Sequence, residues 1–153
     1  MKIMITGGTG QLGGDCVEVL EQRHEIVSLG SRDLDITSRT AVENLVGEID
    51  PQVILNCAAF TKVDDCETKR ELAQKVNVEG PRNLGAAAKK QGAQLIHIST
   101  DYVFDGTKKV PEPYTEQDGT NPISYYGVTK LEAEEAVRGE TDNHMIFRTA
   151  WMY

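Results

Sequence analysis

The stretch Lys2-Ile3-Met4-Ile5-Thr6, followed by Gly7-Gly8-Thr9-Gly10-Gln11-Leu12-Gly13, decides the fold. Its first five residues form a short apolar run that predicts a strand, and the glycines predict a tight turn into a helix. Glycines at this spacing let the backbone approach a pyrophosphate, whose charge the helix N-terminus can stabilise. Because the spacing alone is a weak signal, a plain tight turn is the alternative interpretation.

The rest of the chain continues the alternation of strands and helices. Further strands are predicted at 24–29, 53–56, 94–99 and 144–148, and helices at 38–46, 69–91 and 124–138, with Gly92 at a helix cap. Residues 105–122 are rich in Gly, Pro, Thr and Asp and predict a long loop. Nearly continuous apolar strands separated by helices indicate an α/β fold with a doubly wound parallel sheet, the Rossmann arrangement, in one domain over 1–153.

Composition excludes several classes of protein. The 153 residues carry a formal net charge of −8, which argues against a nucleic-acid partner. Since no apolar run is long enough to span a membrane and the N-terminus lacks a secretory signal, we expect a cytoplasmic protein without a membrane partner. Three cysteines without paired spacing predict reduced thiols. His24, His97 and His144 share no spacing, so we interpret them as packing or surface residues and expect no metal site.

The turn after the second predicted strand bears on the choice of dinucleotide. An arginine there can accept the 2′-phosphate of NADPH, whereas a carboxylate favours the ribose hydroxyls of NADH. Ser31 and Arg32 favour NADPH, while Asp33 and Asp35 keep NADH open. The alternative for Arg32 is a solvated loop charge.

Tyr126 and Lys130 are four residues apart on a predicted helix and therefore project from the same face. A tyrosine becomes an effective acid or base near neutral pH when a nearby ammonium stabilises its phenolate. Taken alone, such a pair is common and usually means an exposed helix face. Thr100 and Asp101 follow a central strand, at the edge where open α/β sheets bind ligands, although they could also form a simple turn.

Together these segments resemble the extended short-chain dehydrogenase/reductase family, and within it the reductases of nucleotide-linked deoxysugars. The resemblance covers the whole chain. It is carried by residues 7–13, 56–64, 76–78, 99–106, 126–130 and 148–151.

The resemblance implies roles for individual residues. Tyr126 would protonate the substrate carbonyl, Lys130 would bind the nicotinamide ribose and lower the tyrosine pKa, and Thr100 would hold the carbonyl. Asn77 would support the catalytic group. Substrate would also contact Asp101 and Trp151, and the dinucleotide would contact Gly7, Gly10, Gln11, Leu12, Gly13, Arg32, Asp35, Ile36, Ala58, Ala59, Phe60, Tyr126 and Lys130.

The segment after Thr100 indicates which reaction the resemblance implies. Similar dehydratases carry an Asp-Glu pair there, because removing water needs a further acid and base, whereas this chain has Asp101-Tyr102. The implied reaction is hydride transfer from NADPH or NADH to the C4 keto group of dTDP-4-dehydro-6-deoxy-L-mannose. The alternatives are another nucleotide-sugar reductase or epimerase, and a non-catalytic NAD(P)-binding regulatory subunit.

Family members continue beyond the tryptophan through a smaller substrate domain. Since this sequence ends at Tyr153, we expect that domain to be missing, and the chain alone to bind its dinucleotide but to turn over substrate slowly. Apolar surface exposed where the missing part packs could support a homodimer.

Overall fold

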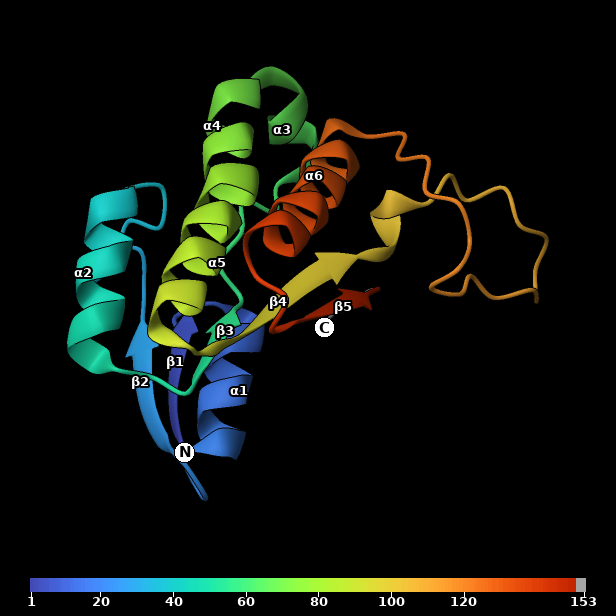
Figure 1. Cartoon of the computed structure of the whole chain (residues 1–153). Helices are drawn as coiled ribbons and strands as arrows, with labels where there is room; N and C mark the ends of the chain where they lie inside the picture. Colours follow the sequence, from blue (N-terminus) through green and yellow to red (C-terminus); the bar gives the residue numbers. More distant parts are fainter. Residues whose placement is uncertain (151–153) are drawn as a thin grey trace.

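The computed structural model describes residues 1–150 and contains one five-stranded sheet (Figure 1). Every neighbouring pair of strands is parallel. The strand order is β2-β1-β3-β4-β5, formed by β1 (Lys2–Thr6), β2 (Glu25–Leu29), β3 (Val53–Asn56), β4 (Gln94–Thr100) and β5 (His144–Thr149). The predicted parallel Rossmann sheet is confirmed.

Helices cover both faces of this sheet. They are α1 (Gln11–Leu20), α2 (Arg39–Ile49), α3 (Val63–Thr68), α4 (Arg70–Gln74), α5 (Gly80–Gln91) and α6 (Tyr125–Glu140). One buried cluster joins α2, α5 and α6 to the strand residues Met4, Ile54 and Leu95. The alternate strand residues, including Ile3 and Ile5, pack with α1 on the opposite face. The period of two along each strand thus sends successive side chains to the two helical layers.

Two helical segments differ from the sequence prediction. The helix expected over 69–91 consists of α4, a π-helical turn at Lys75–Glu79 and α5, which follow one another directly. Helix α3 was not predicted, because its six residues are too few to show a period of 3.6. Gly92 ends α5 with a φ of 77°, as its predicted capping role requires.

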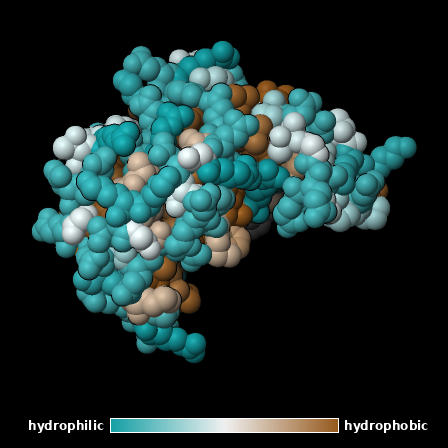
Figure 2. Space-filling model, in the orientation of Figure 1, coloured by the Kyte–Doolittle hydropathy of each residue, from teal (hydrophilic) through white to brown (hydrophobic). Residues whose placement is uncertain are grey.

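The edge strand β5 leaves apolar side chains exposed. Met145 and Phe147 pair with Ile96 and Ile98 of β4, so they lie on the same side of the sheet as α1. They are 43% and 46% exposed, and hydrophobic residues are visible near the position of β5 in Figure 2, on a surface that is otherwise mostly hydrophilic. No helix within residues 1–150 combines the length and apolar character needed to cross a membrane.

The glycine turn between β1 and α1 is packed directly against backbone. Gly7 has a φ of 71°, and a Cβ there would lie 2.6 Å from the Ala58 nitrogen. A Cβ on Gly13 would overlap the Gly7 carbonyl group, whose carbon would lie 2.7 Å away. Side chains are therefore excluded at both positions, which keeps the turn close to the segment after β3.

We predict that Gly13→Ala lowers the free energy of unfolding by about 1–3 kcal/mol or more, because the added methyl group overlaps neighbouring backbone. Gly47→Ala is the matched control: Gly47 lies in α2, and a Cβ there would meet nothing within 4 Å. Alanine should stabilise this exposed helix position by about 0.5–1 kcal/mol. Urea unfolding of both variants measures these changes. Equal free energies of unfolding for the two variants would contradict the packing argument.

Candidate functional site

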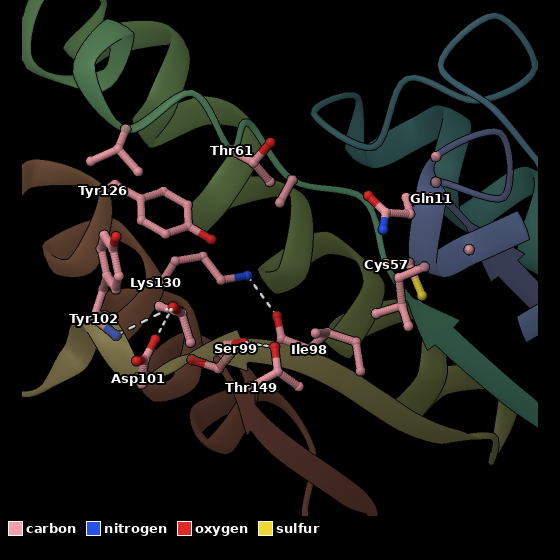
Figure 3. A pocket seen from close by; sticks show the side chains of 17 residues that line it. Gln11, Cys57, Thr61, Ile98, Ser99, Asp101, Tyr102, Tyr126, Lys130 and Thr149 are labelled. Atoms are coloured by element: carbon pink, nitrogen blue, oxygen red, sulfur yellow. Dashed lines mark hydrogen bonds between the residues drawn. The ribbon is translucent and has the colours of Figure 1, made fainter. Parts of the chain in front are cut away.

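A cavity of about 430 Å³ opens at the carboxyl ends of β1, β3, β4 and β5, where the sequence led us to expect a site (Figure 3). The glycine turn and α6 contribute opposite walls. It is lined by Gly7, Gly10, Gln11, Leu12, Gly13, Cys57, Ala59, Thr61, Val63, Ile98, Ser99, Thr100, Asp101, Tyr102, Tyr126, Lys130 and Thr149. The fold therefore brings the glycine motif and the Tyr-Lys pair to one cavity.

A second cavity, of about 290 Å³, lies on the β2 side of the glycine turn. Gly7, Gly10, Cys57 and Ala59 line both cavities, so the two meet over the turn. The second cavity also contains Ser31, Leu34, Asp35, Ile36 and Ala58. Together they form a groove with two ends, which suits an extended ligand with a ring at each end.

The N-terminus of α1 enters the middle of this groove. Gly10 is the N-cap and has no side chain that could accept a hydrogen bond from the first turn. Backbone N–H groups of that turn are therefore not capped by residue 10 and can donate to a ligand. No acidic residue lies in that first turn. Backbone donors and the helix dipole make this position favourable for phosphate.

Lys130 enters the first cavity from α6 and is 2% exposed. Its Nζ donates a hydrogen bond to the Ile98 carbonyl oxygen at 2.6 Å (Figure 3). Burial lowers the pKa of Lys130 to about 8. The amine is therefore fixed in position and titrates close to neutral pH.

Tyr126 points its hydroxyl into the same cavity, and its ring makes an edge-to-face contact with Tyr102 at a centroid distance of 5.9 Å (Figure 3). Burial raises the pKa of Tyr126 to about 12, while interaction with the Thr100 side chain opposes this shift. In the ligand-free chain burial dominates the shift, and the expected lowering of this pKa by Lys130 stays a prediction. The phenol stays protonated at neutral pH.

Thr100 and Asp101 lie where β4 ends and the chain turns away from the sheet. The Thr100 hydroxyl donates to Asp101 Oδ1 at 3.2 Å and accepts from the Tyr102 backbone N–H at 3.2 Å. This side chain caps the 3-10 turn at Asp101–Val103. Thr100 therefore forms the turn that was the alternative interpretation, and it also lines the cavity.

Asn77 connects the segment after β3 to α6. Its amide accepts from the Phe60 N–H at 2.7 Å and donates to the Phe60 carbonyl at 3.1 Å. It also donates to the Thr129 hydroxyl at 3.0 Å, which in turn donates to the Tyr126 carbonyl. Asn77 thus supports the helix turn between Tyr126 and Lys130 without a hydrogen bond to either side chain.

The carboxylate of Glu134 anchors α6 to the sheet. It is fully buried and accepts hydrogen bonds from Ser99 of β4 at 2.7 Å and from two nitrogens of Arg148 of β5 at 2.8 and 2.7 Å. Arg138 adds a bond at 3.0 Å. Burial raises the pKa of Glu134, but these hydrogen bonds outweigh it and leave the pKa below its ordinary value.

The remaining predicted site residues are placed as follows. Among the described residues, neither Arg32 nor Phe60 lines the two cavities; Arg32 is exposed, and Phe60 contributes its backbone to Asn77. Asp35 lines the second cavity while its carboxylate accepts from the Thr37 N–H and hydroxyl. Trp151 lies outside the described residues.

Sequence reasoning missed several residues of the cavity. Cys57, Thr61 and Thr149 line it, and all three follow or end strands that were predicted. Their position just after or at the end of predicted strands, at the carboxyl edge of the sheet, could have identified them. His97 was assigned to packing or surface; it is fully buried, and its ring lies 3.5 Å from the Lys130 amine.

The fold and this arrangement of Tyr126, Lys130 and Thr100 beside a glycine turn place the chain in the class of short-chain dehydrogenases/reductases. Residues 1–153 match the family described as RmlD substrate binding domain, and the chain belongs to that family.

Individual proteins similar to this chain carry related names. A dTDP-4-dehydrorhamnose reductase of Sinorhizobium fredii is 41% identical over 100% of this chain and 51% of its own length. The crystal structure of a dTDP-4-dehydrorhamnose reductase from Clostridium acetobutylicum is 49% identical with a TM-score of 0.97, covering 100% of this chain and 54% of that one. The Bacillus anthracis dTDP-4-dehydrorhamnose reductase, solved with NADP, is 41% identical with a TM-score of 0.95, covering 99% and 54%. The chain spans about half the length of the curated relatives it matches.

We predict that Glu134→Gln lowers the free energy of unfolding at neutral pH by about 3 kcal/mol, because it leaves Arg148 without its carboxylate partner. Since the folded pKa of Glu134 lies below its ordinary value of 4.5, its contribution is present above that pH and is lost as the pH falls through the folded pKa. The cost of the substitution should therefore shrink in acid.

Urea unfolding at neutral and acidic pH checks this, with Glu135→Gln as the control because Glu135 is an exposed neighbour on the same helix. An equal, small effect of both substitutions at neutral pH would contradict an anchoring role for Glu134.

Proposed function

We propose that this chain is the NAD(P)-binding Rossmann portion, 1–153, of a reductase that transfers hydride from NADPH to the C4 keto group of dTDP-4-dehydrorhamnose. The observation that carries the proposal is that Tyr126 and Lys130 share one cavity with the glycine turn and Thr100. The names of the relatives at about 40% identity support the substrate, and the NADP complex of one of them supports the cofactor.

The groove fits a dinucleotide by its shape and its donors. Gly7 and Gly13 exclude side chains, so a diphosphate could approach the backbone where α1 begins. The second cavity, with Leu34 and Ile36, would hold the adenosine end, and the first cavity the nicotinamide end. When bound there, NADPH supplies the hydride.

The chain's own residues would manage the proton. Because its pKa is raised, the Tyr126 hydroxyl keeps its proton at neutral pH and can give it to the C4 oxygen as that oxygen gains charge. Lys130, when protonated, would stabilise the phenolate left behind, and the Thr100 hydroxyl would hold the carbonyl oxygen. Asp101 and Trp151 would contact the sugar. The retained Tyr126, Lys130 and Thr100 favour an enzyme over a non-catalytic regulatory subunit.

Preference for NADPH over NADH rests on the turn after β2. The Asp33 carboxylate accepts from the Gly30 N–H at 2.8 Å, and Asp35 is similarly engaged with Thr37, so both carboxylates already serve the turn. Arg32 is exposed beside Ser31, which lines the cavity, and its long side chain could reach a 2′-phosphate there. A homodimer and a cytoplasmic location stay predictions.

The proposal predicts that the chain binds NADPH and that dTDP-4-dehydrorhamnose causes its oxidation, even if slowly. Tyr126→Phe should reduce this oxidation by at least about 100-fold, because the proton donor is removed, while NADPH affinity stays close to that of the unaltered chain. Calorimetry measures the affinity, and loss of NADPH absorbance measures the oxidation.

Tyr125→Phe is the matched control, because the Tyr125 hydroxyl bonds to Gln74 outside the cavity. Absence of NADPH binding, or equal oxidation by the Tyr126 and Tyr125 variants, would reject the proposal.

We also predict that Arg32→Ala weakens NADPH binding by about tenfold or more, the effect of losing a charged hydrogen bond, and leaves NADH binding unchanged. Arg23→Ala removes another exposed charge just after α1 and serves as the control. Calorimetric titration with both dinucleotides gives the ratio of affinities, and an unaltered ratio in the Arg32 variant would count against its assignment.

A further inference from the structure

A chain of buried polar side chains crosses the sheet next to the cavity, from the last residues of β1 and β3 to the middle of β4. The Thr6 hydroxyl of β1 donates to Asn56 Oδ1 of β3 at 2.7 Å, and Asn56 Nδ2 lies 3.0 Å from His97 Nδ1 of β4. His97 Nε2 lies 3.5 Å from the Lys130 amine. All four residues are at most 2% exposed.

The orientation of the Asn56 amide is fixed by backbone. The Ala58 N–H, which can only donate, points at Asn56 Oδ1 at 3.1 Å. A flipped amide would set two donors against each other there, so Nδ2 must face His97. Because Nδ2 is a donor, His97 Nδ1 must accept and therefore carries no proton.

We propose that His97 is a positioning residue for Lys130: locked by Asn56 in the tautomer protonated at Nε2, it presents an N–H rather than a lone pair to the lysine amine. An ammonium group has only donors and gains nothing from this contact, whereas a neutral amine can accept from it. The contact thus favours release of a proton from Lys130. Burial and Lys130 hold the pKa of His97 well below its ordinary value, so the ring stays neutral.

Other groups around Lys130 do not replace this effect. Cys57, after β3, is a neutral thiol at neutral pH because burial raises its pKa to about 12. Glu134, one turn along α6, favours the charged amine but is engaged by Ser99, Arg148 and Arg138. Tyr126 on the same helix keeps its proton. The Ile98 carbonyl accepts a hydrogen bond from either form of the amine.

The relevance of this arrangement to catalysis rests on the proposed function, but the arrangement itself can be tested without turnover. Long-range nitrogen–proton NMR correlations of the unaltered 153-residue chain report which ring nitrogen of His97 carries the proton. We expect a protonated Nε2 and a bare Nδ1. A protonated Nδ1 would overturn the proposal, and this measurement does not depend on any variant folding.

The Asn56→Asp variant is expected to reverse the tautomer of His97. Its carboxylate can still accept from Thr6 and Ala58 but would also accept from His97 Nδ1–H, which turns Nε2 into an acceptor for the ammonium. We expect the tautomer to switch and the proton affinity of Lys130, followed by NMR titration of its side chain, to rise about tenfold or more.

Thr6→Val is the matched control, because Ala58 still fixes the Asn56 amide; both the tautomer and the Lys130 titration should stay as in the unaltered chain. A rise in Lys130 proton affinity in Asn56→Asp without a switch of tautomer would assign the effect to the new charge alone and reject the proposal. A switch without a rise would reject it as well.

Discussion

The buried carboxylate of Glu134 is the interaction on which the geometry of the site depends. It accepts hydrogen bonds from Ser99 on β4 and from Arg148 on β5, and it belongs to α6, one turn after Lys130. A helix could otherwise slide or rotate over a sheet while keeping its apolar contacts, because those contacts have little directional preference. The carboxylate selects one register, in which Tyr126 and Lys130 both reach the cavity at the strand ends.

Burial rather than charge pairing governs ionisation in this cavity. Desolvation disfavours the charged form of each group, so it raises the pKa of Tyr126 and lowers that of Lys130. At neutral pH Tyr126 therefore keeps its proton, while Lys130, with a pKa of about 8, remains mostly charged. Such a pair suits a site that donates a proton to a substrate oxygen, because the donor is loaded before substrate arrives and negative charge develops only during the reaction.

The parallel sheet, the glycine turn and the Tyr-Lys pair could be predicted from the sequence, since each rests on local spacing. The connections of Asn77, Asn56 and Glu134 to other strands and helices could not, because they join side chains 14 to 52 residues apart through hydrogen bonds that no periodicity encodes. His97 shows the same limit: an isolated histidine in an apolar strand looks like packing until α6 sets Lys130 against its ring. The net rise of the Tyr126 pKa could not be predicted either, because burial depth is not visible in a spacing of four residues.

The central claim is that the two cavities on either side of the glycine turn form one dinucleotide site with Tyr126 at its reactive end. Nuclear Overhauser effects between NADPH and the isotope-labelled chain test it most directly. The account predicts contacts from the nicotinamide ring to the Tyr126 ring and from the adenine to the side chains of Leu34 and Ile36. Contacts from the nicotinamide only to Phe104 and Tyr114, in the neighbouring pocket, would contradict it.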